Sequence, residues 1–195
     1  MPAAEVREPA DAAATGGAPA ALLLECEQLV RQAAALGPVV DLGCGRGRNV
    51  LACARWQLAT VAIDRDRDAL SQLQRSARAS DANPLLLPVR GDLETDLGLP
   101  IKAESCGVIL VFCFLFRPLA EWIVRALAPG GLLLYETFTR EQLALGWGPR
   151  NPDFLLRTGE LRGLFPGLEV LRYDEAIRSG NRRKATARLV ARRPH

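Results

Sequence analysis

Three acidic side chains stand where three successive apolar segments end, and they are well placed to bind a ligand. Asp41 follows the apolar pair that begins at Val39, Asp64 ends the β-rich stretch 59–64, and Asp92 comes shortly after the run 85–89. The carboxyl ends of parallel strands meet at one edge of a sheet, where ligands bind, so these acids are expected to lie together. Helix capping explains Asp92 alone equally well, but the three acids together favour a nucleoside site.

A glycine-rich loop follows the first of these acids directly, in the sequence "VVDLGCGRGRN" of residues 39–49. Glycines stand at every second position of the loop, and a helix is expected to begin near Arg48. Glycine lets a ligand come close to the backbone, and the N–H groups that open a helix bind a phosphate or a carboxylate. The loop therefore predicts a ligand with an anionic group held against the backbone.

The spacing of the glycines distinguishes two cofactors. A dinucleotide site normally reads G-x-G-x-x-G and faces a pyrophosphate, whereas this loop reads G-x-G-x-G and follows an acid. The carboxylate of Asp41 repels a pyrophosphate but attracts an ammonium or a sulfonium group. S-adenosylmethionine carries both of these cations, with a carboxylate for the helix, a ribose for Asp64 and an adenine amine for Asp92. The pattern favours S-adenosylmethionine.

The elements that must position these residues alternate along the chain. Residues 22–36 have helical periodicity, and from Val39 onward strands are separated by helical patterns. Several of the strands are continuous apolar runs, which predicts an α/β fold with a parallel sheet covered on both faces. Near the end, residues 168–173 and 184–192 read as two antiparallel strands joined by a short turn.

Length and composition predict one domain. The 195 residues, 49% apolar and 24% charged, suit one soluble globular domain. Residues 1–20 have almost nothing to bury and are expected to be a disordered lead-in, which leaves 21–195 as the domain. No segment is long and apolar enough to cross a membrane and no signal peptide is evident, so a cytoplasmic location is expected.

Cysteine and histidine usage narrows the chemistry. The five cysteines form no C-x-x-C pair, and their odd number suits reduced thiols. The one histidine is the final residue, His195, so we expect neither a zinc site nor a histidine-based catalytic group.

The basic end of the chain has two interpretations. From Arg178 onward there are seven cations and no acid, which leaves a net charge of −4 for the rest, because the whole chain carries +3. Such a region can bind nucleic acid, or it can be a solvated edge strand whose charges discourage aggregation. No aromatic residue stands between these cations in the sequence, as base stacking would need. The edge-strand interpretation is therefore favoured.

Four motifs resemble those of class I S-adenosylmethionine-dependent methyltransferases. They read "VVDLGCGRGRN", "VAIDRDRDAL", "VRGDLE" and "LAPGGLLLYE", and they span about Gly37 to Glu136. The resemblance implies a Rossmann-like, doubly wound, mostly parallel seven-stranded sheet with a C-terminal antiparallel hairpin. A narrower resemblance, to the small methyltransferases of the tellurite-resistance group, rests on "CGRGRN", "NPDFLLRTGELRGLFPGLEVLRYDE" and "KATARLVARR".

This resemblance also implies cofactor contacts. Those expected at the methionine end are Asp41, Gly43, Cys44, Gly45 and Gly47, with Asn49 as a further cofactor-binding residue. Those expected elsewhere are Asp64 and Arg65 at the ribose, Asp92 and Leu93 at the adenine, and Phe112 and Cys113 at the sulfonium side.

The acceptor side is less specified. Its candidate residues are Arg117, Tyr135, Trp147 and Phe154. Tyr135 and Glu136 are candidates for a general base, although Tyr135 also suits packing and Glu136 a turn cap. Arg117 suits an anion contact or a solvated helix start. Phe112, Phe114 and Phe116 alternate toward one face and suit either the core or the wall of a dry pocket.

The glycine- and proline-rich segment 138–156 follows the fifth expected strand. It is predicted to be a mobile cover over the acceptor pocket. The alternative is a static connector whose aromatic side chains pack on the final hairpin.

Three functions agree with these features. The first is methyl transfer to a small molecule with a soft or anionic nucleophile, such as a thiol or a chalcogen oxyanion. The second is methylation of RNA or protein that docks on the basic C-terminal region. The third is a non-catalytic S-adenosylmethionine-binding partner subunit.

Overall fold

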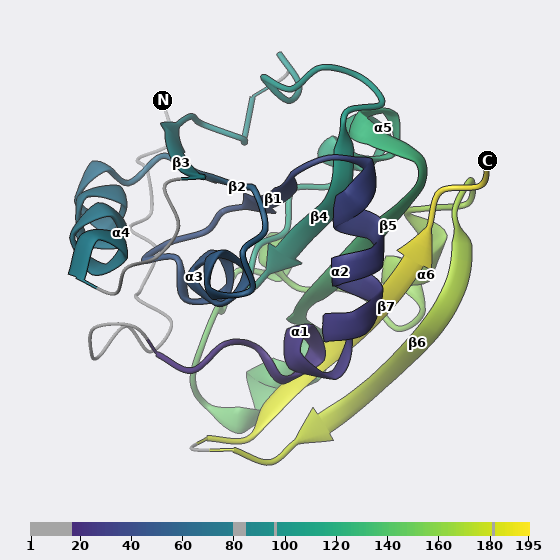
Figure 1. Cartoon of the computed structure of the whole chain (residues 1–195). Helices are drawn as coiled ribbons and strands as arrows, with labels where there is room; N and C mark the ends of the chain where they lie inside the picture. Colours follow the sequence, from purple (N-terminus) through teal and green to yellow (C-terminus); the bar gives the residue numbers. More distant parts are fainter. Residues whose placement is uncertain (1–16, 80–84, 96, 181) are drawn as a thin grey trace.

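One mixed sheet organises the chain. The computed structural model describes residues 17–79, 85–95, 97–180 and 182–195. In these residues seven strands form a sheet in the order β3-β2-β1-β4-β5-β7-β6 (Figure 1). The strands are β1 (Val39–Leu42), β2 (Thr60–Asp64), β3 (Leu86–Arg90), β4 (Cys106–Phe112), β5 (Leu127–Phe138), β6 (Glu169–Arg178) and β7 (Lys184–Arg192).

The pairing confirms the predicted topology. Strands β3, β2, β1, β4 and β5 pair in parallel, whereas β7 is antiparallel to both β5 and β6. Strand β1 lies between β2 and β4, so the chain reverses its progress across the sheet after β3. Ligands of such folds bind at this reversal, outside the carboxyl ends of the strands. Asp41 and Asp64 both lie at this edge.

Helices cover both faces of the sheet. In Figure 1, α1 to α3 lie in front of the sheet and α5 and α6 lie behind it. The helices are α1 (Ala21–Glu25), α2 (Glu27–Ala33), α3 (Arg48–Arg55), α4 (Arg67–Ala79), α5 (Leu119–Ala126) and α6 (Glu160–Gly163), with 3-10 turns η1 (Ala34–Leu36), η2 (Arg140–Leu145) and η3 (Pro152–Phe154). The helix expected over residues 22–36 is interrupted at Cys26. No described helix has the length and apolar character that a membrane span needs.

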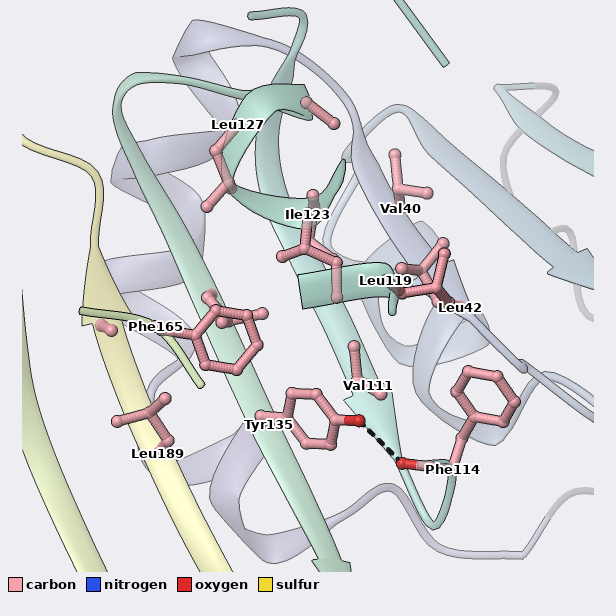
Figure 2. Packing of buried hydrophobic residues seen from close by; sticks show 14 of the residues in the cluster. Val40, Leu42, Val111, Phe114, Leu119, Ile123, Leu127, Tyr135, Phe165 and Leu189 are labelled. Carbon is pink, nitrogen blue, oxygen red and sulfur yellow. Dashed lines mark hydrogen bonds between the residues drawn. The ribbon is translucent and has the colours of Figure 1, made fainter. Parts of the chain in front are cut away.

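Buried strand β4 shows how the core is built. All seven of its residues are buried, as expected for a strand with helices on both sides. Ile109 and Val111 pack with α5 and α6 on one face, within the cluster shown in Figure 2, whereas Val108, Leu110 and Phe112 pack with α1 and α2 on the other.

The expected alternation of three phenylalanines on one face is wrong. Strand β4 ends at Phe112, and the chain turns at Cys113, whose φ is 55°. Phe114 consequently packs in the cluster on the opposite face from Phe112, with Phe116 half-buried against that same cluster.

Candidate cofactor and acceptor site

The glycine loop joins β1 to α3 and is fixed to the end of β2. The backbone N–H groups of Gly43 and Cys44 both donate to the carbonyl of Ile63, at 2.9 and 3.0 Å. Gly45 has a φ of 54°, and a Cβ built on it would meet no atom within 4 Å. The backbone at Gly45 is therefore open to an approaching ligand, as the sequence predicts.

Gly47 has a different role from the one predicted. It precedes α3 in the left-handed conformation, with a φ of 79°, and a Cβ there would lie 2.3 Å from Cδ1 of Leu73. Helix packing between α3 and α4 therefore explains this glycine without a cofactor.

Asp41 carries an orphaned buried oxygen. The residue is 1% exposed, and its Oδ2 has no hydrogen-bond partner among the described residues. Burial raises the pKa of this carboxyl from 3.8 to about 7; the charge of Arg48 opposes the rise and that of Asp64 adds to it. A buried carboxylate without a partner is costly, and a cationic ligand group would remove that cost. The α-ammonium of S-adenosylmethionine has the required charge.

Asp64 organises the loop from the end of β2. Its Oδ2 accepts from the backbone N–H of Gly45 at 2.7 Å, and its Oδ1 accepts from the N–H of Asp66 at 2.9 Å. The side chain is almost fully buried and contributes to the wall of a cleft. Because each carboxylate oxygen has more than one lone pair, the residue can hold the loop and still accept from a hydroxyl group.

The cleft lies where β1, β2 and β3 end. It is lined by Gly43, Asp64, Arg65, Gly91, Asp92, Leu93, Glu94 and Phe114. Five of these lining residues are among the predicted cofactor contacts, whereas Gly91, Glu94 and Phe114 are not. Arg65 pairs with Glu94 at 2.7 Å, and Oδ1 of Asp92 accepts from the N–H of Glu94 at 2.9 Å. Asp92 therefore closes a local turn and caps no helix.

Three predicted cofactor contacts lie outside this cleft. Cys44 is buried among α3 and α4 residues, and Phe112 is buried against α1 and α2. Asn49 is buried as well, and its Oδ1 accepts from the backbone N–H of Ala20 at 2.9 Å. Asn49 therefore anchors the chain before α1. Residues 1–16 of the expected lead-in lie outside the described residues.

Cys113 stands where the cofactor side meets the final hairpin. It is the exposed cysteine of the five, and its backbone N–H donates to the carbonyl of Glu136 at 2.9 Å. Desolvation by the surrounding protein raises the pKa of its thiol, and the nearby charges of Arg48 and Lys184 oppose that rise. A thiol with a raised pKa is a poor nucleophile, which agrees with a role in packing or contact.

Arg117 is a clamp and not an anion contact. Its guanidinium pairs with both carboxylate oxygens of Glu160, at 2.5 and 3.1 Å. It also donates to the carbonyls of Asp153 and Leu155, at 2.6 and 3.1 Å. These four bonds connect the start of α5 to η3 and α6, so the predicted substrate role of Arg117 is wrong.

Tyr135 is a core residue. It is 3% exposed, its ring lies 5.9 Å from that of Phe165, and its hydroxyl donates to the carbonyl of Phe114 at 3.0 Å (Figure 2). Burial raises the pKa of this phenol. Tyr135 therefore remains a neutral hydrogen-bond donor, and its predicted roles as a base or an acceptor contact are wrong.

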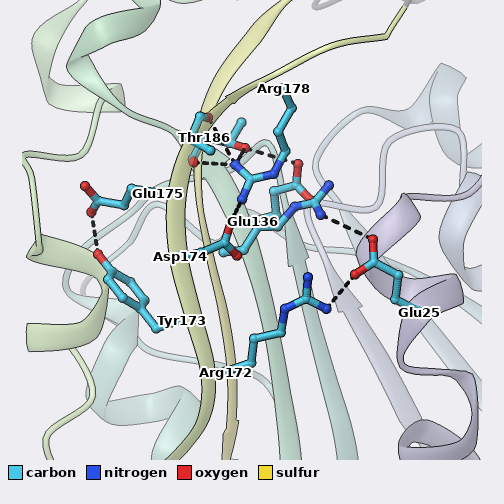
Figure 3. A network of polar contacts seen from close by, with 10 residues as sticks. Glu25, Glu136, Arg172, Tyr173, Asp174, Glu175, Arg178 and Thr186 are labelled. Carbon is cyan, nitrogen blue, oxygen red and sulfur yellow. Dashed lines mark hydrogen bonds and ion pairs between the residues drawn. The ribbon is translucent and has the colours of Figure 1, made fainter.

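Glu136 points to the opposite face of β5, into the polar network of Figure 3. Its Oε2 lies 3.0 Å from Nε of Arg188, and its Oε1 accepts from the hydroxyl of Thr186 at 3.4 Å. Arg178 bonds to the carbonyl of Thr186 at 2.7 Å and pairs with Asp174. Glu136 is thus part of a charge network on β5, β6 and β7, and it caps no turn.

Segment 138–156 is attached to the final hairpin. The indole N–H of Trp147 donates to the carbonyl of Arg183 at 3.0 Å, and the Trp147 ring contacts that of Phe138. The buried amide of Gln142 accepts from the N–H of Ala185 at 2.9 Å. Trp147 thus packs as the static alternative predicts, while Phe154 stays 37% exposed.

The basic turn before β7 does have an aromatic partner. The guanidinium of Arg182 lies over the Trp147 ring, 5.6 Å from its centroid. The sequence pattern missed this contact because the two residues are far apart along the chain.

Comparison with known families agrees with this geometry. Residues 39–131 match the family model described as a methyltransferase domain. The chain carries a class I S-adenosylmethionine-dependent methyltransferase domain. The matched residues include the glycine loop, Asp64 and the cleft, so S-adenosylmethionine is the cofactor and S-adenosylhomocysteine its product.

Solved structures share the methyltransferase fold over most of the chain. One, from a study of the conversion of a disulfide bond into a thioacetal group during echinomycin biosynthesis, is 22% identical with a TM-score of 0.71, covering 96% of this chain and 85% of its own. TehB from Haemophilus influenzae is 20% identical with a TM-score of 0.66, covering 86% of this chain. This chain spans 62% of that TehB chain.

A further structure, an S-adenosylmethionine-dependent methyltransferase from Methanosarcina mazei, is 17% identical with a TM-score of 0.64, covering 80% of this chain and 92% of its own. No curated protein sequence matches the chain. The likeness to TehB agrees with the resemblance to the tellurite-resistance group.

Proposed function

We propose that this methyltransferase acts on a small molecule whose nucleophile is soft or already anionic, such as a thiolate or a chalcogen oxyanion. The observation that carries the proposal is the state of the two candidate bases. Tyr135 is buried and donates its proton to a carbonyl, and Glu136 is paired with Arg188. The one histidine of the chain is its last residue. An acceptor that needs no base suits these residues.

The chemistry of such an acceptor is an in-line displacement. A lone pair of the sulfur, selenium or tellurium centre forms a bond to the methyl carbon as the carbon–sulfonium bond breaks. The electron pair of the broken bond stays on the cofactor sulfur and gives neutral S-adenosylhomocysteine. No proton has to move, so positioning of the two reactants is the main contribution of the protein.

Charge near the end of β4 supports an anionic acceptor. Arg48 and Lys184 both act on the Cys113 thiol, from the α3 and β7 sides. Two cations near the expected position of the sulfonium favour the approach of an anion. The likeness to a structure from a study of disulfide-to-thioacetal conversion also points to sulfur chemistry, although at 22% identity it carries only the fold.

The cofactor contacts form part of the same proposal. Asp41 binds the α-ammonium group, and the open backbone at Gly45 accommodates the methionine part. Asp64 and Arg65 hold the ribose. Asp92 and Leu93 bind the adenine. The cleft and the orphaned Asp41 oxygen support these assignments.

The test is an acceptor screen with the full chain. S-adenosylhomocysteine release is measured with aryl thiols, selenite and tellurite, and with phenols and amines of similar size. The proposal expects turnover with thiols or chalcogen oxyanions. Turnover confined to phenols or amines would contradict it. Glu136→Gln is a useful variant, because loss of a bystander charge should leave the thiol rate within about threefold when S-adenosylhomocysteine affinity shows intact folding.

The contact between Arg182 and Trp147 keeps an RNA acceptor as a second candidate, because cations beside an aromatic ring suit base stacking. RNA affinity that falls steeply with salt, together with methylation of that RNA, would favour this second function.

A further inference from the structure

The chain just before α1 lies against the cofactor loop. We call residues 17–20 the N-terminal strap. The strap is held by Asn49, whose Oδ1 accepts from the N–H of Ala20 at 2.9 Å, and the Ala20 side chain is 7% exposed. Nη1 of Arg48 donates to the carbonyl of Ala18 at 3.4 Å. Two adjacent residues that open α3 therefore contact the strap.

Arg48 is also directed toward the cofactor side of the loop. Its charge lowers the pKa of Asp41 at the end of β1 and that of Cys113 after β4. Because electrostatic effects fall with distance, the guanidinium lies near both groups. Its bond to the strap is long for an N–H···O hydrogen bond, and a guanidinium has five N–H donors in a planar fork.

We propose that Arg48 binds the carboxylate of the methionine part of the cofactor and that the strap closes this end of the site. A zwitterionic amino acid needs a cation for its carboxylate and an anion for its ammonium group. Arg48 and the orphaned oxygen of Asp41 supply that pair on the two sides of the glycine loop. The inference rests on S-adenosylmethionine as the cofactor, and it makes Asn49 a positioning residue that acts through the strap.

This arrangement makes the site selective for nucleosides that carry the amino-acid part. 5′-Methylthioadenosine has the same adenine, ribose and sulfur as S-adenosylhomocysteine, but it lacks the carboxylate and the ammonium group. It therefore makes the cleft contacts without the Arg48 contact, and it separates the two ends of the site.

The test compares these two ligands by calorimetric titration. Arg48→Met should raise the Kd of S-adenosylhomocysteine by about tenfold or more, as for loss of a charge-assisted contact. The Kd of 5′-methylthioadenosine should stay within about twofold. Arg48→Lys should restore part of the S-adenosylhomocysteine affinity. Arg55→Met, the same change on the exposed end of the same helix, is the matched control and should change neither Kd.

Equal weakening of both ligands, or no effect on S-adenosylhomocysteine, would overturn the role of Arg48. If the unchanged protein bound neither ligand, the cofactor assignment itself would fail, which is a different result. For the strap, hydrogen exchange at residues 18–25 should slow when S-adenosylhomocysteine binds, and Asn49→Ala should reduce that slowing. Identical exchange with and without ligand in the unchanged protein would overturn the closure.

Discussion

Asp41 should make cofactor affinity depend on pH. Burial raises the pKa of its carboxyl to about 7 in the free protein, and the α-ammonium group of the ligand favours the ionised form. Binding therefore releases a proton, and affinity rises with pH up to the pKa. At pH 5.5 only about 3% of the carboxyl is ionised, so the Kd of S-adenosylhomocysteine should be about thirtyfold higher than at pH 8.

The assay is calorimetric titration between pH 5.5 and 8 in buffers of different ionisation enthalpy, which also counts the protons released. Asp41→Asn should weaken binding and remove most of this pH dependence. 5′-Methylthioadenosine should bind with little pH dependence, because it has no ammonium group. A flat profile for the unchanged protein, or an equal slope in Asp41→Asn, would refute the reasoning.

The same group affects the stability of the free protein. Its folded pKa lies above the ordinary value of 3.8, so its stabilising contribution is complete below about pH 4 and is lost as the pH rises through 7. Over that window the shift corresponds to about 4 kcal/mol of unfolding free energy. The difference between the unchanged protein and Asp41→Asn in urea unfolding at pH 5 and pH 8 measures it.

Further expectations concern the loop, the clamp and the connector. Asp64→Ala should weaken S-adenosylhomocysteine binding by about 2–3 kcal/mol and lower stability by about 1–3 kcal/mol, because the Gly45 amide loses its acceptor; unchanged affinity in calorimetry would remove the ribose role. Gly45→Val should abolish binding in a protein that still folds by circular dichroism, and a normal Kd would disprove backbone approach. Arg117→Met should cost about 1–3 kcal/mol in urea unfolding, and no loss would refute the clamp. Strong hydrogen-exchange protection in 138–156 with and without ligand is expected from the Trp147 contacts, whereas slowing only with ligand would indicate a cover.

The sheet was predictable because its signals are local. Continuous apolar runs, helical periodicity and the short turn before β7 each report on neighbouring residues, and together they gave the parallel core and the final hairpin. The acids at the strand ends were predictable for the same reason. Asp41 and Asp64 follow from where apolar runs stop, and parallel pairing then brings their strands together.

The errors arose where the reason for a residue lies far away in the chain. Gly47 is required by Leu73 on α4, and Asn49 is engaged by Ala20, so a loop motif alone assigns both to the cofactor. The pairing of Arg117 with Glu160 has no local signal either. One turn at Cys113 was enough to move Phe114 to the opposite face.

The central claim is that the methyltransferase transfers its methyl group to a nucleophile that needs no base from the protein. The most direct measurement is kcat/KM for two aryl thiols of different acidity as a function of pH, at saturating S-adenosylmethionine. The account predicts that the midpoint of each profile moves with the pKa of the thiol, because only the thiolate reacts. A midpoint that stays at one pH for both thiols would show that a group of the protein removes the proton, and it would contradict the account.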